Sequence, residues 1–261
     1  MSPISEEFKA ILEVSNVTRR FGGLCAVNTV SFMVQEEEIF GLIGPNGAGK
    51  TTLFNIITGL LPPSGGQLIY QRERITQCSP YQIAAKGIAR TFQNLRLFGN
   101  LSVLENVAIA HHIHYQTNLF KSLLGLPPTA LEEQETYTKS RELLALMGLS
   151  QKAEQLACNL AYGDQRRLEI ARALALKPKI LLLDEPAAGM NPIERSALSE
   201  LIRQIRADFN LTVILIDHHV PLVMGLCDRI AVLDFGQLIA LGRPETVKND
   251  PAVIEAYLGD E

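Results

Sequence analysis

A glycine-rich run of eight residues has the composition and spacing of a phosphate-binding loop. It matches the pattern GxxxxGK[ST] and consists of Gly44, Pro45, Asn46, Gly47, Ala48, Gly49, Lys50 and Thr51. Glycines let successive backbone N–H groups converge on an anion, because no Cβ obstructs the approach. An apolar run precedes the loop and a helical pattern follows it, as such a loop requires. A tight strand-to-helix turn without a ligand is the alternative.

Two side chains of this loop (residues 44–51, the P-loop below) give it a chemical role. We expect the Lys50 ammonium to reach the β- and γ-phosphates of a nucleotide, and the Thr51 hydroxyl to ligate Mg²⁺. All eight residues, together with Thr52, are predicted to line the nucleotide site.

A pair of carboxylates follows the apolar run at residues 180–183. Carboxylates at the end of a buried strand are costly unless they face a metal or a reacting group. We therefore expect Asp184 in the Mg²⁺ shell and Glu185 as the acceptor of a proton from an attacking water. Two solvated carboxylates at a strand end are the alternative interpretation.

Strands alternate with helices on either side of these groups, which predicts an α/β fold whose parallel sheet is covered on both faces. Predicted strands are residues 12–21, 27–34, 39–43, 180–183 and 212–216, with a terminal hairpin at 229–233 and 237–241. Predicted helices are 51–58, 194–207 and 251–258.

The segment from about residue 94 to residue 160 differs, because it lacks strong strand signals. Helical patterns occupy 103–111 and 132–147, and a Gly-Leu-Pro-Pro sequence at 125–128 interrupts them. We interpret this segment as a helical subdomain inserted into the α/β core.

Composition excludes several classes of protein. Of the 261 residues 47% are hydrophobic, which is too many for a disordered chain, and the formal net charge is −4, which argues against a nucleic-acid partner. The longest apolar runs are far shorter than the roughly 20 residues that span a bilayer. Glu6 and Glu7 argue against a signal peptide. The four scattered cysteines are expected as small core residues in the cytosol.

Further positions, in the expected order along the chain, resemble the motifs of ABC ATPases. The run before the carboxylates resembles the family's LSGGQ signature and consists of Leu160, Ala161, Tyr162, Gly163, Asp164 and Gln165. Gln93 matches the Q-loop, His218 the switch histidine and Asn191 the D-loop, whose usual residue is Asp. Phe21 stands where the family stacks an aromatic ring on adenine, although a core role is the alternative.

The resemblance implies a P-loop NTPase core of ABC ATPase type, with an N-terminal antiparallel β region and an inserted helical subdomain. It implies ATP and Mg²⁺ as ligands, with Gln93 touching the metal and His218 holding the γ-phosphate. Two ATPase domains would meet head to tail, so that Ala161, Tyr162, Gly163 and Asp164 contact the nucleotide of the opposite chain. The signature serine is replaced by Ala161, which should weaken that contact without abolishing it.

Details of the sequence are similar to one subfamily, the larger ATPase subunit of bacterial branched-chain amino acid importers of the LIV type. These details are the runs at 21–24, 90–93, 159–165 and 256–259, and a longer helical insert around 111–134. The resemblance implies integral-membrane permease subunits, a second ATPase subunit or a second copy as partner, and indirectly a periplasmic substrate-binding protein. The expected location is peripheral, at the cytoplasmic face of the inner membrane.

The same resemblance divides the chain into a nucleotide-binding core (1–93 and 164–242), a helical subdomain (94–163) and a C-terminal tail (243–261). Three other functions stay open. They are a related urea or amide importer, an ABC ATPase without a transport role, and a regulatory subunit that binds ATP without turnover. Intact Glu185 and His218 argue against the last of these.

Other polar residues have ordinary interpretations. We expect His111, His112 and His114 at a solvated helix end, because no Cys or carboxylate completes a metal site. Arg166 and Arg167 are expected on an exposed helix face, because they form no extended basic stripe.

Overall fold

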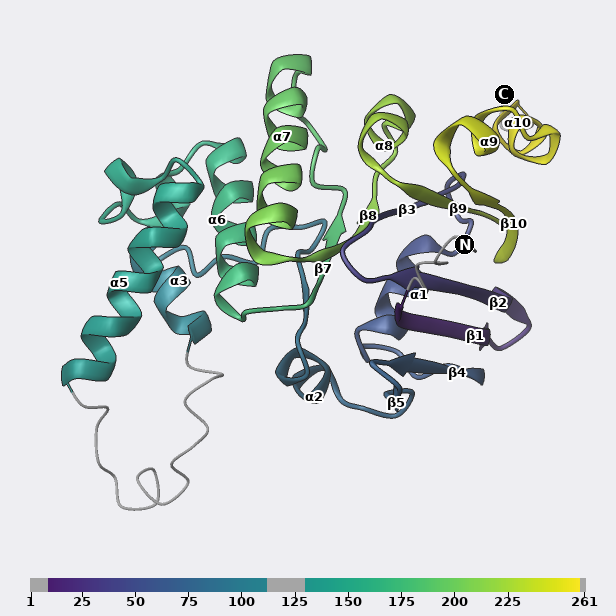
Figure 1. Cartoon of the computed structure of the whole chain (residues 1–261), viewed down its shortest axis with the longest axis horizontal. Helices are drawn as coiled ribbons and strands as arrows, with labels where there is room; N and C mark the ends of the chain where they lie inside the picture. Colours follow the sequence, from purple (N-terminus) through teal and green to yellow (C-terminus); the bar gives the residue numbers. More distant parts are fainter. Residues whose placement is uncertain (1–8, 112–129, 259–261) are drawn as a thin grey trace, which may run out of the picture.

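Two β-sheets form the framework of the molecule (Figure 1). The computed structural model describes residues 9–111 and 130–258. The larger sheet runs in spatial order β10 (Gln237–Gly242), β9 (Arg229–Asp234), β3 (Ile39–Ile43), β8 (Thr212–Ile216), β7 (Ile180–Asp184) and β6 (Ile88–Arg90). Its strands β9, β3, β8, β7 and β6 are parallel to one another, and only the edge strand β10 is antiparallel. The predicted parallel sheet is therefore confirmed.

The smaller sheet is antiparallel and precedes most of the chain. Its spatial order is β2 (Leu24–Gln35), β1 (Ala10–Phe21), β4 (Gly65–Tyr70) and β5 (Glu73–Arg74). The turn between β1 and β2 falls at Gly22 and Gly23, between the predicted strands 12–21 and 27–34, and β2 begins at Leu24. Strands β4, β5 and β6 were not predicted, because short strands that begin with glycine or contain charged residues carry no clear alternation.

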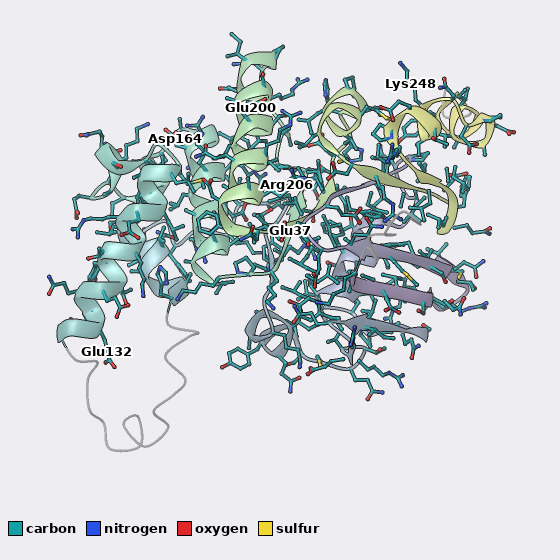
Figure 2. The ribbon with its side chains drawn as sticks, in the orientation of Figure 1. Glu37, Glu132, Asp164, Glu200, Arg206 and Lys248 are labelled. Atoms are coloured by element: carbon teal, nitrogen blue, oxygen red, sulfur yellow. The ribbon has the colours of Figure 1, made fainter. Side chains whose placement is uncertain are left out.

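Helices cover both faces of the larger sheet. The helix α1 (Lys50–Ile57) lies between the two sheets, and the small helix α2 (Pro80–Ala85) lies near them. The opposite face carries α3 (Val103–His111), α5 (Ala130–Leu146), α6 (Tyr162–Ala175), α7 (Pro192–Phe209) and α8 (Val220–Leu226). The chain ends in α9 (Pro244–Lys248) and α10 (Pro251–Leu258). Charged side chains such as Glu200 and Lys248 lie at the periphery (Figure 2).

Alternate residues of the buried strands enter two separate cores, as the two-residue period of a strand requires. In β7, Leu181 and Leu183 pack with the helices α3 and α5 to α8, whereas Ile180 and Leu182 pack with α1 and the smaller sheet. The predicted helical segment thus shares its core with one face of the sheet. The domain boundaries proposed from the sequence stay a prediction.

Several expectations about single residues are wrong. Of the cysteines only Cys227 is buried; Cys25 and Cys78 are half-buried, and Cys158 is exposed within the 3₁₀ turn Ala157–Asn159. His111 is buried, because α3 packs against α5 and α6. His112, His114 and the interruption at 125–128 lie outside the described residues, as does most of the insert at 111–134.

Two glycines of the P-loop allow a close approach between backbone segments. A Cβ on Gly44 would lie 2.0 Å from the carbonyl oxygen of Leu233, and one on Gly49 would lie 2.4 Å from that of Ala26. Both glycines have positive φ, 148° and 98°, which side chains disfavour. The turn between β3 and α1 is therefore fixed by contacts with β9 and β2.

We predict that Gly44→Ala lowers the free energy of unfolding by about 2–4 kcal/mol, because it adds both backbone strain and a steric overlap. Urea unfolding followed by circular dichroism measures the change. Gly225→Ala is the matched control, since Gly225 lies within α8 with open space around its Cα, and it should be neutral or slightly stabilising. Equal stability of Gly44→Ala and the unaltered chain would contradict this account.

Candidate nucleotide site

The strand order of the larger sheet brings four polar segments to one edge. The P-loop follows β3, His218 follows β8, Glu185 follows β7 and Gln93 follows β6, and these strands are neighbours in the order β3-β8-β7-β6. Because the strands are parallel, their carboxyl ends lie at the same edge. A pocket of about 280 Å³ lies there, lined by Ala26, Asn46, Gly47, Ala48, Gly49, Lys50, Thr51, Thr52, Gln93, Glu185 and His218.

The Lys50 ammonium lies within the loop that it belongs to. Its Nζ donates to the carbonyl oxygens of Gly44 at 2.6 Å and Pro45 at 2.7 Å. Burial lowers the pKa of Lys50 from its ordinary value, while the nearby Glu185 carboxylate acts in the opposite direction. Two carbonyl oxygens of the loop thus hold a positive charge beside the start of α1, where an anion is favoured.

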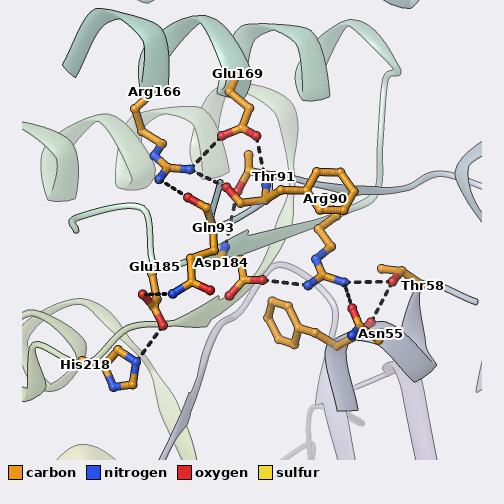
Figure 3. A network of polar contacts seen from close by, with 12 residues as sticks. Asn55, Thr58, Arg90, Thr91, Gln93, Arg166, Glu169, Asp184, Glu185 and His218 are labelled. Atoms are coloured by element: carbon orange, nitrogen blue, oxygen red, sulfur yellow. Dashed lines mark hydrogen bonds and ion pairs between the residues drawn. The ribbon is translucent and has the colours of Figure 1, made fainter. Parts of the chain in front are cut away.

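The carboxylate of Glu185 lies between Gln93 and His218 (Figure 3). Its Oε2 accepts a hydrogen bond from Gln93 Nε2 at 2.9 Å, and its Oε1 lies 2.6 Å from His218 Nε2. Its backbone N–H donates to Ile216 at the end of β8, at 2.8 Å. The residue has a φ of 48°, a left-handed conformation that is costly for a side-chain-bearing residue and is found at functional sites. The predicted catalytic residues Glu185, Gln93 and His218 are therefore together.

Asp184 is buried beside an arginine that the sequence analysis gave no role. Arg90 Nη2 contacts Asp184 Oδ2 at 2.7 Å, and Arg90 Nη1 donates to Asn55 at 2.7 Å and Thr58 at 3.2 Å. A buried carboxylate needs such a partner, because removal of its charge from water costs several kcal/mol. Arg90 thus ties the end of β7 to α1.

The segment after β8 is held by a second buried carboxylate. Asp217 Oδ1 accepts from the His219 N–H at 2.8 Å, and Oδ2 accepts from the Ala187 N–H at 3.3 Å. Burial raises the pKa of Asp217 from its ordinary value. His219 Nδ1 accepts from the Leu222 N–H at 3.1 Å and caps α8, so His219 has a structural role and only His218 faces Glu185.

The four signature residues predicted to bind nucleotide lie at the start of α6, and none of them lines the P-loop pocket. Ala161 occupies the N-cap position without a side-chain hydrogen bond, and Tyr162 is 45% exposed. Gly163 has open space around its Cα, and Asp164 contacts Lys152. One chain therefore does not bring the signature residues and the P-loop into one site.

The prediction that Arg166 is exposed is wrong. Its side chain is completely buried between α6 and the segment after β6. Its Nη1 lies 2.8 Å from Glu169 Oε2, one helical turn along α6. Burial raises the pKa of Glu169 from its ordinary value, while the Phe92 N–H and the Arg166 charge lower it. A charged pair at i and i+3 is typical of solvated helix faces, which is why the sequence alone did not indicate its burial.

Phe21 and Asn191 lie at exposed positions. Phe21 ends β1 with 43% of its surface exposed, and the Arg19 guanidinium lies 4.6 Å from its ring centroid, so it is not a core residue. Asn191 caps α7 by a reciprocal pair of hydrogen bonds with Glu194, at 3.0 and 2.9 Å. Its amide therefore serves the helix start.

The last helix, α10, lies on the other side of the P-loop, a placement that the sequence did not predict. Burial raises the pKa of the Tyr257 hydroxyl of α10, while the nearby Gly44 N–H acts in the opposite direction. A cavity of about 480 Å³ lies between the P-loop and α10, lined in part by Asn46 and Glu255. In the described parts of the chain, no helix has the length and apolar character needed to cross a bilayer.

Family models and known proteins match most of this chain. A family model described as ABC transporter matches residues 27–188, and one described as branched-chain amino acid ATP-binding cassette transporter matches residues 237–261. The high-affinity branched-chain amino acid transport ATP-binding protein LivG of Salmonella typhimurium is 48% identical over 96% of this chain and 98% of its own length. Its counterpart BraF of Pseudomonas aeruginosa is 46% identical, over 97% and 99%.

A solved structure has the same fold over nearly the whole chain. The ATP-binding cassette MJ1267 in its ADP conformation superposes with a TM-score of 0.83 at 32% identity, covering 96% of this chain and 99% of MJ1267. The fold is thus that of an ATP-binding cassette. The chain belongs to the ABC transporter family, as one of its ATP-binding subunits.

Proposed function

We propose that this chain hydrolyses ATP to drive the uptake of branched-chain amino acids by an ABC importer. The observation that carries the hydrolytic part is the Glu185 carboxylate, held between Gln93 and His218 on the wall of the P-loop pocket. The cargo is supported by the printed names of LivG and BraF and by the family match over residues 237–261. A related urea or amide importer is the alternative.

Phosphate binding in this proposal rests on the P-loop. Its backbone N–H groups and the start of α1 surround the β- and γ-phosphates, and the Lys50 ammonium moves from the carbonyls of Gly44 and Pro45 to the phosphate oxygens. Because Lys50 is buried at this point, its charge acts in a medium of low dielectric constant and is weakly screened. The developing negative charge on the γ-phosphate is thereby stabilised.

The residues also fit a magnesium ion. Thr51, Asp184 and Gln93 offer hydroxyl, carboxylate and amide oxygens, which are the donors that Mg²⁺ prefers, and the buried charge of Asp184 would gain a second cationic partner. When bound, Mg²⁺ neutralises charge on the phosphate oxygens. Asp184 keeps its contact with Arg90, which fixes the carboxylate at the end of β7.

Proton transfer is assigned to Glu185. Its carboxylate accepts a proton from the attacking water. Gln93 and His218 each contact one of the two carboxylate oxygens and so fix the orientation of the group. His218 is 46% exposed at its side chain and faces the pocket, so it is also placed to donate to the γ-phosphate. Positioning and charge stabilisation supply most of the rate in this class of reaction.

A complete site requires two chains in this proposal. Ala161 and Tyr162 are exposed and Gly163 and Asp164 half-buried at the start of α6, and none of the four lines the P-loop pocket, which is the arrangement expected if they contact the nucleotide of an opposite chain. The partner is the second ATPase subunit of the importer or another copy of this chain. Permease subunits dock at the cytoplasmic face beside Gln93 and the helical segment, with a periplasmic binding protein acting indirectly.

Glu185→Gln should retain ATP binding and lose hydrolysis by at least about a hundredfold, because it removes the proton acceptor but keeps the shape of the side chain. Binding is measured by fluorescence titration with labelled ATP, and hydrolysis by phosphate release. The dimer of this variant should also accumulate in the presence of ATP. Unchanged turnover would place the base elsewhere.

The cargo is tested in the same assay with the assembled importer in proteoliposomes. Binding protein loaded with leucine should stimulate hydrolysis by the unaltered chain, and Glu185→Gln should abolish both the stimulation and leucine uptake. Stimulation by urea or an amide, and not by leucine, would replace the proposed cargo by the alternative.

Phe21→Ala should weaken ATP binding by about 1–2 kcal/mol, or roughly 5–30-fold, if its exposed ring stacks on adenine. GTP binding should weaken alike, since stacking does not read base edges, and Phe21→Tyr is the control that keeps the ring. Equilibrium titration gives the affinities. Unaltered ATP affinity in Phe21→Ala would exclude the stacking role.

A further inference from the structure

Arg166 and Glu169 form a charged pair that the proposed mechanism does not use. They lie one turn apart on α6, with exposed fractions of 0% and 5%. The cost of taking both charges out of water offsets much of their attraction. Such a pair is therefore a poor means of stabilising a fold compared with apolar side chains. A positional role accounts for it better, and its contacts indicate what it positions.

Three of these contacts are with the backbone of residues 92–93. Arg166 Nη1 donates to the Phe92 carbonyl at 2.6 Å, and Nη2 donates to the Gln93 carbonyl at 2.9 Å. Glu169 Oε1 accepts from the Phe92 N–H at 3.0 Å. Phe92 and Gln93 lie outside helix and strand, and side chains of α6 supply the hydrogen bonds to these three backbone groups. Figure 3 shows the pair and the segment together.

Gln93 connects this backbone segment to the catalytic carboxylate of Glu185. Its carbonyl is fixed by Arg166, and its side-chain amide donates to Glu185 at 2.9 Å. A displacement of about 1 Å at a catalytic group can cost about a hundredfold in rate. Arg166 therefore lies two contacts away from Glu185, through a single intervening residue.

The same guanidinium also reaches the signature loop. Arg166 Nη2 lies 3.0 Å from the Tyr162 hydroxyl, and its Cζ is 5.7 Å from the centroid of the Tyr162 ring. Tyr162 is 45% exposed in the first turn of α6. One side chain thus contacts both the signature loop and the Q-loop.

We propose that Arg166 is a positioning residue for ATP hydrolysis, which holds Gln93 against Glu185 and links this contact to the signature loop through Tyr162. The inference rests on the proposed function, in which the signature loop contacts the nucleotide of the opposite chain. When the two chains close on that nucleotide, Arg166 then also orients Glu185 at the nucleotide bound to the chain's own P-loop. Glu169 keeps the guanidinium in its orientation.

A double-mutant cycle tests the first part of this proposal. Arg166→Gln should lower kcat by about 10–100-fold and leave both KM and the ATP dissociation constant within about twofold. In a Gln93→Ala background the same change should cost less than about threefold, because the residue through which Arg166 acts is gone. Losses that multiply in the double variant, or an unchanged kcat in Arg166→Gln, would overturn the proposal.

Arg167→Gln is the matched control, since Arg167 is the neighbouring arginine on α6 and is half-buried. It should leave kcat unchanged, and a loss equal to that of Arg166→Gln would overturn the proposal. If Arg166→Gln does not fold, Arg166→Lys enters the same cycle, because it keeps the charge opposite Glu169 but not the two-pronged contact with residues 92–93. Its loss should also disappear in Gln93→Ala.

Tyr162→Phe tests the link to the signature loop, because it removes only the hydroxyl. It should lower kcat by about threefold in the unaltered chain and have no effect in Arg166→Gln. An equal loss in both backgrounds would overturn the link. Glu185→Gln separates the two proposals: unchanged hydrolysis in this variant contradicts the assignment of the base to Glu185, whereas lost hydrolysis with normal turnover in Arg166→Gln contradicts only the positioning role.

Discussion

The order of four parallel strands is the constraint on which the candidate site depends. Strands β3, β8, β7 and β6 lie side by side, and each carries a polar group beyond its carboxyl end. Glu185 takes its place between Gln93 and His218 because β7 lies between β6 and β8. The P-loop joins them because β3 is the next strand along. A change in this order would separate the groups, whatever their distance in the sequence.

Two buried ion pairs complete the frame around these strand ends. Arg90 with Asp184 joins the end of β7 to α1, and Arg166 with Glu169 joins α6 to the segment after β6. Buried pairs contribute little net stability, since desolvation offsets much of their attraction, but they require defined geometry. Their value in this chain lies in orientation, because each one fixes a segment that carries a predicted site residue.

Much of the fold could be predicted from the sequence because its signals are local. The P-loop pattern, the apolar runs before the P-loop and Asp184, and the helical spacing of Leu198, Leu201, Ile202 and Ile205 each report on one element. The helix α2 also has a local signal in the sequence, although it was not predicted. This signal is a capping box from Ser79 to Gln82 with Pro80 between them. The burial of Arg166 had no local signal, because it results from packing against a segment more than 70 residues earlier.

The central claim is that each hydrolytic site combines the P-loop of one chain with the signature loop of another, and mixing two inactive variants tests it most directly. Lys50→Ala disables the P-loop, and Gly163→Glu disables the signature loop at a position where the structure leaves room for a side chain. Each variant alone should be inactive. In a mixed dimer, confirmed by native mass spectrometry with ATP·Mg²⁺, one site collects both lesions and the other none, so turnover should return to about half that of the unaltered dimer. Mixed dimers as inactive as either variant alone would contradict the account.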